Sequence, residues 1–309
     1  MLIGVGLAMD GQRLLIVTGK GGVGKTTVAA AYATALAARG KRVLVAMCNA
    51  KERLSVMLGS DLISTEVTRV VPNVWAVNMT PESALEEYGM IALRSKTLYQ
   101  LLFDNKYVRV FFRAVPGIQE WSMLGKAWWH TTETLPDGSP KYDVVILDAP
   151  ATGHGLDMLR VPKVIVDVVP PGLLRRDAER AWNMFRDPEA CGVVLVTIPE
   201  EMPTSETIEL AGALQDELGM SIARVVVNAV LPPLFSREER DVLEPLEVTA
   251  VDAGSSALVA SRSRAVRERV QAESLARLAR ALPVTPAYFP LLFEDAATPF
   301  AIKELAKRL

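Results

Sequence analysis

The sequence has little of the chemistry on which disulfide scaffolds and metal clusters depend. Only two of its 309 residues are cysteines, Cys48 and Cys191, and they form no C-x-x-C pair. This argues against a disulfide framework and against a cysteine zinc site. The chain also lacks any uninterrupted apolar run of about eighteen residues, the length typical of a membrane-spanning helix. Its formal net charge of −2 provides no overall attraction to nucleic acid or to an anionic membrane. We therefore expect a soluble cytoplasmic protein with no nucleic-acid partner.

Apolar residues, by contrast, make up 50% of the chain, which is enough for a sizeable core. Short apolar runs recur between helix-like segments, at residues 14–17, 43–46, 74–77, 144–147, 193–196 and 224–227. Runs of Val, Ile and Leu without polar alternation are typical of strands covered on both faces. Their alternation with helices predicts an α/β fold with a doubly wound, mostly parallel sheet.

Residues 81–140 interrupt this alternation with an apolar, helix-rich stretch that ends in a turn at 136–140. We expect an inserted helical subdomain here and a second helical piece near 173–185. Residues 256–282 look like one long, arginine-rich amphipathic helix, whose charges we read as a solvated face. The whole chain, 1–309, is then a single domain around one sheet, with the helical subdomain inserted in it.

A phosphate-binding loop is the most specific motif of the chain. Residues 19–27 read GKGGVGKTT and contain the pattern G-x-x-x-x-G-K-[ST] between a strand-like run and an alanine-rich helical segment. In this setting Lys25 reaches the β- and γ-phosphates of ATP, and the Thr26 hydroxyl binds Mg²⁺. Backbone N–H groups of the glycine loop cradle the phosphates. The predicted nucleotide-binding residues of the loop are Gly21, Gly22, Val23, Gly24, Lys25, Thr26 and Thr27.

Two further polar residues follow predicted strands. Asp148 ends the run at 144–147, where an acidic residue can hold Mg²⁺ through water, so we predict a metal site from Thr26 and Asp148. Asn228 follows the run at 224–227. Ligands of doubly wound sheets sit at the carboxyl ends of the strands, so the loop, Asp148 and Asn228 converge on one edge.

The residues after Asp148 read APATGHG, and here the chain resembles the ArsA family, which includes the ATPase that targets tail-anchored membrane proteins. The resemblance assigns Thr152, Gly153 and His154 to switch II, although residues 149–151 read Ala-Pro-Ala where the common order is Thr-Ala-Pro. The extra lysine at Lys20 looks like the deviant phosphate loop shared with MinD and ParA. It implies that Lys20 crosses a dimer interface to the partner's nucleotide; the alternative is a solvent-facing lysine.

The resemblance extends over most of the chain. Residues 196–203, VTIPEEMP, look like the family's strand end, and VVN at 226–228 matches a segment whose asparagine binds adenine. An amide can both donate to and accept from a base edge. Outside that pattern Asn228 is more often a turn former. Residues 288–291 look like the family's late loop near the base, which adds Pro290 to the nucleotide site.

The match fails at switch I. Aligning Leu54 and Ser55 with the family pattern places Asn49 where an aspartate polarises the attacking water. An amide orients water but is not a general base near neutral pH. Glu52 can substitute only along a different loop path, and Asn49 can also be a structural turn residue. The candidate catalytic residues are Lys20, Lys25, Asn49 and Asp148. Three accounts stay open: slow turnover, a nucleotide-binding pseudoenzyme, or one half of a heterodimer.

These features predict an ATPase that uses ATP and Mg²⁺ and acts as a dimeric switch for targeting or chaperoning hydrophobic membrane-protein clients. The dimer pairs two identical chains or two paralogues. Apolar helices between residues 90 and 112 form either a client groove or ordinary core. Two cysteines cannot build a three-ligand arsenite sensor. A MinD- or ParA-like spatial organiser is an alternative, with Lys303, Lys307 and Arg308 as a basic tail.

Overall fold

A computed structural model describes residues 11–93, 117–150, 154–282, 284–293 and 297–309. Its centre is one eight-stranded sheet with the order β3-β4-β2-β5-β1-β6-β7-β8. The strand pairs are parallel except for β3 with β4. The strands are β1 (Leu14–Gly19), β2 (Val43–Cys48), β3 (Thr68–Val71), β4 (Val74–Met79), β5 (Val144–Asp148), β6 (Cys191–Thr197), β7 (Ile222–Val230) and β8 (Ala287–Pro290). The predicted α/β class and mostly parallel sheet are confirmed.

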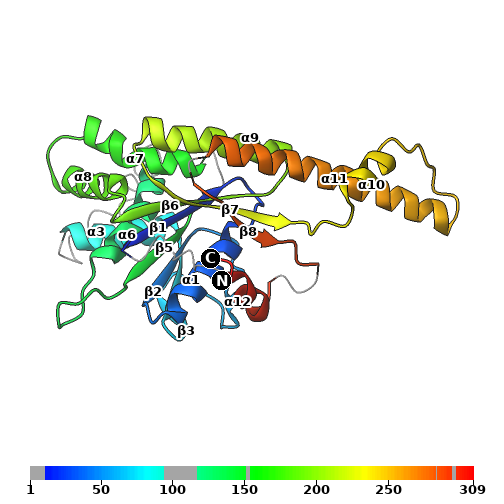
Figure 1. The fold of residues 1–309 in the computed structure, drawn as a ribbon. Coiled ribbons are helices and arrows are strands. Elements are labelled where there is room, and N and C mark those ends of the chain that lie inside the picture. Colours follow the sequence, from blue (N-terminus) through cyan, green and yellow to red (C-terminus); the bar gives the residue numbers. More distant parts are fainter. Residues whose placement is uncertain (1–10, 94–116, 151–153, 283, 294–296) are drawn as a thin grey trace.

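Helices cover both faces of the sheet (Figure 1). One layer holds α1 (Lys25–Ala38), α2 (Leu54–Leu58) and α12 (Pro299–Ala306). The other holds α6 (Ile118–Thr132), α7 (His154–Val168), α8 (Leu173–Arg186), α9 (Glu201–Gly212) with a π turn at Ala213–Glu217, and α11 (Ala253–Ala281). Two further helices, α3 (Pro81–Leu93) and α10 (Arg237–Leu243), lie outside these layers, α3 against α6 and α10 against α11.

Strand β1 explains why continuous apolar runs predict this architecture. Leu14 and Ile16 pack into the core under α6–α9, whereas Leu15 and Val17 pack into the core under α1 and α12. All four side chains are fully buried. A central strand with helices on both sides has no polar face, so its sequence shows no alternation.

The six strands predicted from apolar runs are present, but two edge strands were not predicted. β3 is short and largely exposed, and β8 occupies residues 287–290, which we expected to belong to a loop. β8 alternates buried Ala287 and Phe289 with exposed Tyr288 and half-buried Pro290. Four residues with one buried face carry too weak a signal to separate a strand from a loop.

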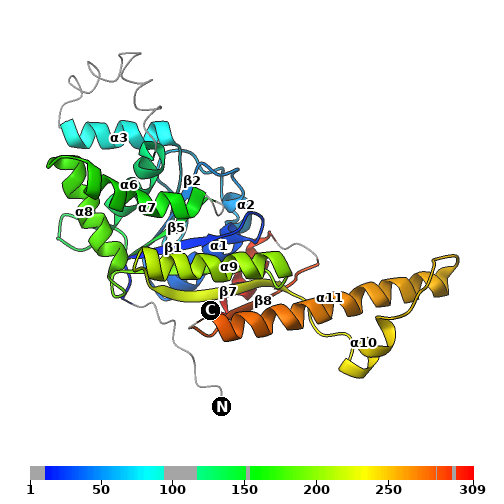
Figure 2. The same ribbon diagram turned by 90° about the horizontal axis from the view of Figure 1, so that it is seen from above.

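The region 81–140 is only partly described. Helices α3 and α6 pack against each other, and α6 also packs on α7 and β5 (Figure 2). Residues 94–116, which hold most of the predicted client groove, lie outside the described residues. The inserted subdomain and its groove therefore stay predictions. The expected turn is present: Thr134 and Pro140 form a bridge around Gly138, whose φ is +83°.

Candidate nucleotide site

The phosphate loop joins β1 to α1 at the carboxyl edge of the sheet. Its glycines have positive φ angles: 152° at Gly19, 83° at Gly22 and 93° at Gly24. A Cβ on Gly19 would lie 2.1 Å from the carbonyl oxygen of Val196, and a Cβ on Gly24 would lie 2.2 Å from Nδ2 of Asn228. Only glycine fits these two positions. Around Gly22, by contrast, nothing lies within 4 Å of a built Cβ, and this residue is exposed.

Lys25 folds back over this loop. Its Nζ donates hydrogen bonds to the carbonyl oxygens of Gly19 and Lys20, at 3.2 and 3.0 Å. Burial lowers the pKa of the Lys25 ammonium, and the nearby Asp148 carboxylate opposes that shift. The ammonium is therefore held at the loop by two neutral acceptors, and a phosphate placed there would offer it a charged one.

Thr26 and Asp148 come together as the sequence predicts. The Thr26 hydroxyl donates a 2.6 Å hydrogen bond to Oδ2 of Asp148, the last residue of β5. Asp148 is only 4% exposed, and burial raises the pKa of its carboxyl to about 6, against the opposing effects of the Thr26 hydrogen bond and the Lys25 charge. In the absence of a cation the carboxyl group is therefore close to half protonated at a pH near 6.

This oxygen pair fits Mg²⁺. The ion prefers oxygen ligands in octahedral geometry and keeps several waters, with one or two protein ligands and substrate phosphates completing its shell. Among the described residues no group of three His, Cys, Asp or Glu could hold a metal by itself.

Lys20 has a partner that the sequence analysis did not identify. Its Nζ lies 2.7 Å from Oε1 of Glu206 on α9, and both side chains are about one-third exposed. The second oxygen of Glu206, Oε2, is buried and has no hydrogen-bond partner among the residues described. In the single chain Lys20 is therefore paired with the opposite helix layer, while about a third of its side chain stays exposed to solvent.

Asn228 lies within β7, so it is not a turn residue. Its Nδ2 donates a 2.9 Å hydrogen bond to the carbonyl oxygen of Val23, which ties β7 to the phosphate loop. The left-handed residue is the next one, Ala229, with φ 57°. Pro290 ends β8 and pairs with Val230, so it lies at the same edge as Asn228. Their roles toward adenine stay predictions.

Asn49 follows the last residue of β2 and adopts a left-handed backbone, with φ 45°. Its N–H donates a 2.7 Å hydrogen bond to Met79, which fixes the loop to β4. Asparagine is among the few side chains that tolerate this conformation. The two oxygens of Glu52 accept hydrogen bonds from the N–H and the hydroxyl of Ser55, at 2.8 and 2.6 Å. Glu52 is engaged at the start of α2.

Of the switch II residues, Thr152 and Gly153 lie outside the described part of the chain, and His154 is the first residue of α7. Gly155, which was not predicted, makes a close approach. A Cβ there would lie 3.0 Å from the Pro150 carbonyl oxygen and 3.1 Å from Oγ1 of Thr18. The start of α7 is therefore packed tightly against the end of β1.

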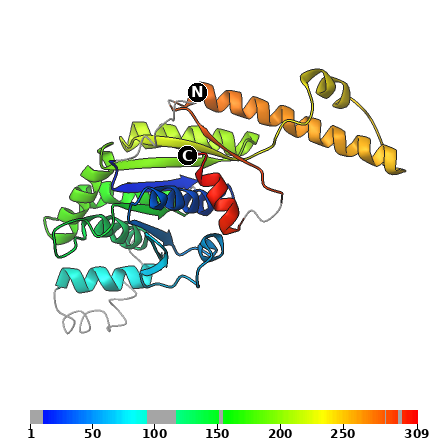
Figure 3. The same cartoon turned by 60° about the horizontal axis from the view of Figure 1, so that its bottom comes forward.

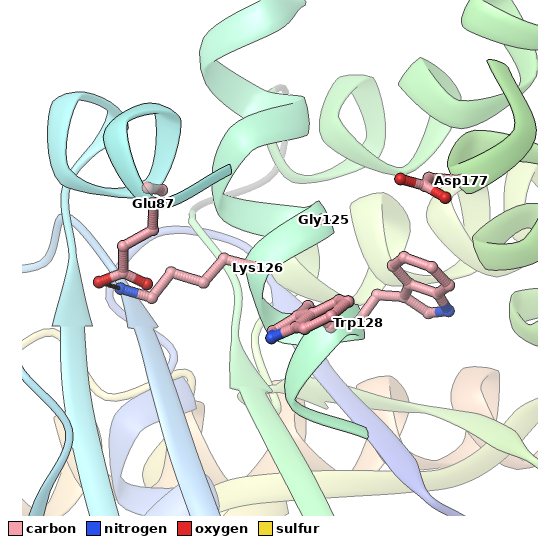
Figure 4. Close-up of a pocket in the computed structure, with 7 residues that line it drawn as sticks. Glu87, Gly125, Lys126, Trp128 and Asp177 are labelled. Carbon is pink, nitrogen blue, oxygen red and sulfur yellow. Dashed lines mark hydrogen bonds and ion pairs between the residues drawn. The ribbon is translucent and has the colours of Figure 1, made fainter. Parts of the chain in front are cut away.

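Apart from the phosphate loop, a small hollow lies in the helical layer, between α3, α6 and α8 (Figure 4). Lys126 is buried there and pairs with Glu87 at 2.8 Å, beside Trp128 and Trp129. The hollow has a volume of about 20 Å³, which is room for little more than one water molecule. In this state it is packing around a buried ion pair rather than a ligand pocket.

Comparison with known proteins agrees with this geometry. The anion-transporting ATPase family, ArsA_ATPase, matches residues 12–170 and 174–244. ATPase BagA of Mycobacterium tuberculosis is 27% identical over 229 residues, which cover 72% of this chain and 67% of that protein. ATPase GET3B of Arabidopsis thaliana is 25% identical over 305 residues, covering 80% and 72%. An arsenical pump-driving ATPase of Escherichia coli is 27% identical over 251 residues, covering 74% of this chain and 41% of that protein. The chain therefore belongs to the ArsA family of ATPases.

Proposed function

We propose that this protein is a slow, Mg²⁺-dependent ATPase that acts as a dimeric nucleotide switch for hydrophobic, membrane-protein clients. The observation that carries the enzymatic part is the Thr26–Asp148 hydrogen bond next to the glycine loop, with the Lys25 ammonium near the Asp148 carboxylate. Lys25 and Thr26 begin α1 and Asp148 ends β5, so the lysine, the hydroxyl and the carboxylate meet at one edge of the sheet. This is the set of groups that phosphoryl transfer by phosphate-loop proteins requires.

The site residues have distinct roles in this proposal. Lys25 exchanges its two carbonyl acceptors for the β- and γ-phosphates. Thr26 and Asp148 hold Mg²⁺, directly and through water. When bound, the ion neutralises charge that develops on the phosphate oxygens. Asn228 keeps the loop in register through Val23.

Turnover is slow in this account because Asn49 replaces a base. Its amide can orient a water molecule but cannot take a proton from it near neutral pH. The same observation favours a second candidate, a nucleotide-binding subunit whose paralogous partner supplies the aspartate. Single-turnover ATP hydrolysis by the pure chain separates the two. Hydrolysis above a Lys25→Ala background supports the ATPase, whereas ATP bound but not hydrolysed supports the partner subunit.

Client binding is proposed for the helical layer. Large apolar side chains are exposed on three of its helices: Trp129 on α6, Val164 and Val168 on α7, and Leu173 on α8. Clustered apolar exposure is typical of interaction surfaces. ATP and ADP should change the binding of a fluorescent hydrophobic probe to this layer. Equal probe binding with ATP, with ADP and without nucleotide would exclude a nucleotide-gated client surface.

Neither a metalloid sensor nor a membrane organiser fits as well. Cys48 and Cys191 are both buried, and burial raises the pKa of each thiol, which disfavours the thiolate that a soft metalloid binds. In α12 the apolar residues Ala301, Ile302 and Leu305 are buried against the body, so they are not available to insert into a membrane surface. No helix in the described ranges is long and apolar enough to span a bilayer.

A further inference from the structure

Helices α10 and α11 form an arm that projects from the body beyond the carboxyl edge of β7 (Figures 1 and 3). The buried side chains of α11 all lie from its thirteenth residue onward, at Ala265, Glu268, Ser274 and Leu278. Residues 253–264 contribute none, and α10 has none either. About half of the arm thus stands free of its own body.

The arm is nevertheless a built structure. A capping box formed by Asp252 and Ser255 begins α11, and one formed by Ser236 and Glu239 begins α10. Glu268, buried in α11, accepts hydrogen bonds from the N–H groups of Leu234 and Phe235. Such contacts fix α10 on α11, so the arm holds its shape without support from the body.

Apolar side chains are nonetheless uncovered along the arm. Val242 is 67% exposed and Val251 is 82% exposed, and Leu234 and Leu258 are exposed as well. Around Val242 lies a hollow of about 430 Å³, lined by Phe235, Glu238, Glu239, Val242 and Leu243. The hollow is open to solvent and is lined by three apolar side chains and two carboxylates, of which Glu239 also caps α10. Because this chain does not cover the hollow, the occupant has to be apolar with positive charge beside it.

The body of the protein carries such a surface on α12. Phe300 is 74% exposed, although Ala301, Ile302 and Leu305 of the same helix are buried. Lys303 and Lys307 follow at i+3 and i+7, so they share a helix face with Phe300. Lys303 has no ion-pair partner among the residues described, whereas Lys307 pairs with Glu304. An exposed aromatic ring flanked by lysines is the chemical complement of the hollow on α10.

We propose that the α10 hollow of one copy receives the Phe300 face of α12 from a second copy of this chain. Figures 1 and 3 both place α10 well away from α12 of the same chain, so the two surfaces meet only between copies. The exchange is self-complementary, since each copy offers one hollow and one α12, as a two-fold dimer requires. The proposal names the partner surface of the dimeric switch proposed above, and depends on that proposal for dimer formation alone.

Disulfide trapping tests the contact directly. The two native cysteines are buried, so an introduced surface cysteine is the reactive thiol. Val242→Cys and Phe300→Cys proteins, mixed under mild oxidation, should form a cross-linked dimer. A mixture of Val242→Cys with Val168→Cys, whose side chain on α7 is similarly exposed at 71%, is the matched control. Equal cross-linking in the two mixtures would overturn the proposal, because it would show random collision only.

Charge exchange gives a second, independent measurement. Glu238→Lys or Lys303→Glu alone should weaken self-association at least about tenfold in sedimentation, and mixing the two variants should restore it. ATP affinity should stay unchanged in both. A dimer whose affinity is unchanged by these substitutions, or a chain that stays monomeric at high concentration, contradicts the arm contact.

The outcomes also separate this proposal from the nucleotide proposal. If ATP does not bind but the arm cross-link forms, the nucleotide proposal fails while the arm contact stands. A different protein or a client helix seated on the arm would leave both charge variants without effect on self-association.

Discussion

The hydroxyl of Thr26 donates a 2.6 Å hydrogen bond to the carboxylate of Asp148, and this bond joins the first turn of α1 to the end of β5. The two residues are 122 positions apart in the sequence. Their contact puts a neutral and an acidic oxygen side by side under the phosphate loop. Such a pair binds a hard cation that is shared with a phosphate.

Removal of the Thr26 hydroxyl should therefore uncouple ATP binding from magnesium. For Thr26→Ala we expect ATP affinity in Mg²⁺ to fall roughly tenfold to a hundredfold, the effect of one lost ligand worth about 1.4–2.8 kcal/mol. Affinity in EDTA should change little. Thr26→Ser keeps the hydroxyl and is the matched control. Calorimetric titration with and without Mg²⁺ measures both, and a Thr26→Ala protein that still gains affinity from Mg²⁺ would rule out this ligand.

Asp148 should make the stability of the nucleotide-free protein depend on pH. Its carboxyl has a pKa of about 6 in the folded chain, above the ordinary value of 3.8, because burial disfavours the charge. The folded state thus holds the proton more tightly, and stability is lost as pH rises from about 4 through about 6. Asp148→Asn should stabilise the protein at pH 8 by at most about 3 kcal/mol, and the gain should vanish near pH 4. Urea unfolding in EDTA at several pH values measures this, and a gain independent of pH would refute it.

The ion pair between Lys20 and Glu206 should oppose ATP-dependent pairing of two copies. If Lys20 reaches a partner's nucleotide, it must first leave Glu206, which costs at most about 1 kcal/mol for a partly exposed pair. Glu206→Gln should then strengthen self-association in ATP up to about fivefold, whereas Lys20→Ala should weaken it. Both should bind ATP normally. Sedimentation with ATP and with ADP is the measurement, and weaker association of Glu206→Gln would mean that Glu206 supports the dimer instead.

Asn49 is the position at which hydrolysis should be most easily gained. Aspartate tolerates the left-handed backbone that Asn49 adopts, so Asn49→Asp should fold normally. A positioned carboxylate base contributes roughly 10²–10⁴-fold, and we expect at least about a tenfold rise in turnover. Asn49→Ala, which removes the side chain, should show no rise. Phosphate release assays compare the three proteins. Unchanged turnover in Asn49→Asp would mean that residue 49 does not face the attacking water.

The fold and the central site could be predicted because their signals are local. The glycine pattern, the apolar run before it and the strand that ends at Asp148 can each be recognised from a stretch of only a few residues. Strand β3 was missed because it is short and has no fully buried residue, and β8 because its burial is one-sided and spans only four residues. The Lys20–Glu206 pair joins residues 186 positions apart, and no sequence pattern marks which helix turn faces the loop. The contact of Glu52 with Ser55, only three residues on, was not anticipated from the sequence either.

Equilibrium binding of Mg²⁺-ATP to the wild-type chain and to Lys25→Ala tests the central claim most directly. Lys25 now rests on two carbonyl oxygens, and the account requires it to pair with phosphate when ATP binds. Lys41→Ala, just before β2 at the opposite edge of the sheet, is the matched control. We expect Lys25→Ala to lose at least about thirtyfold in affinity, as for removal of one partner of a buried charge pair, and Lys41→Ala to bind like wild type. Equal ATP affinity in all three proteins would contradict the account.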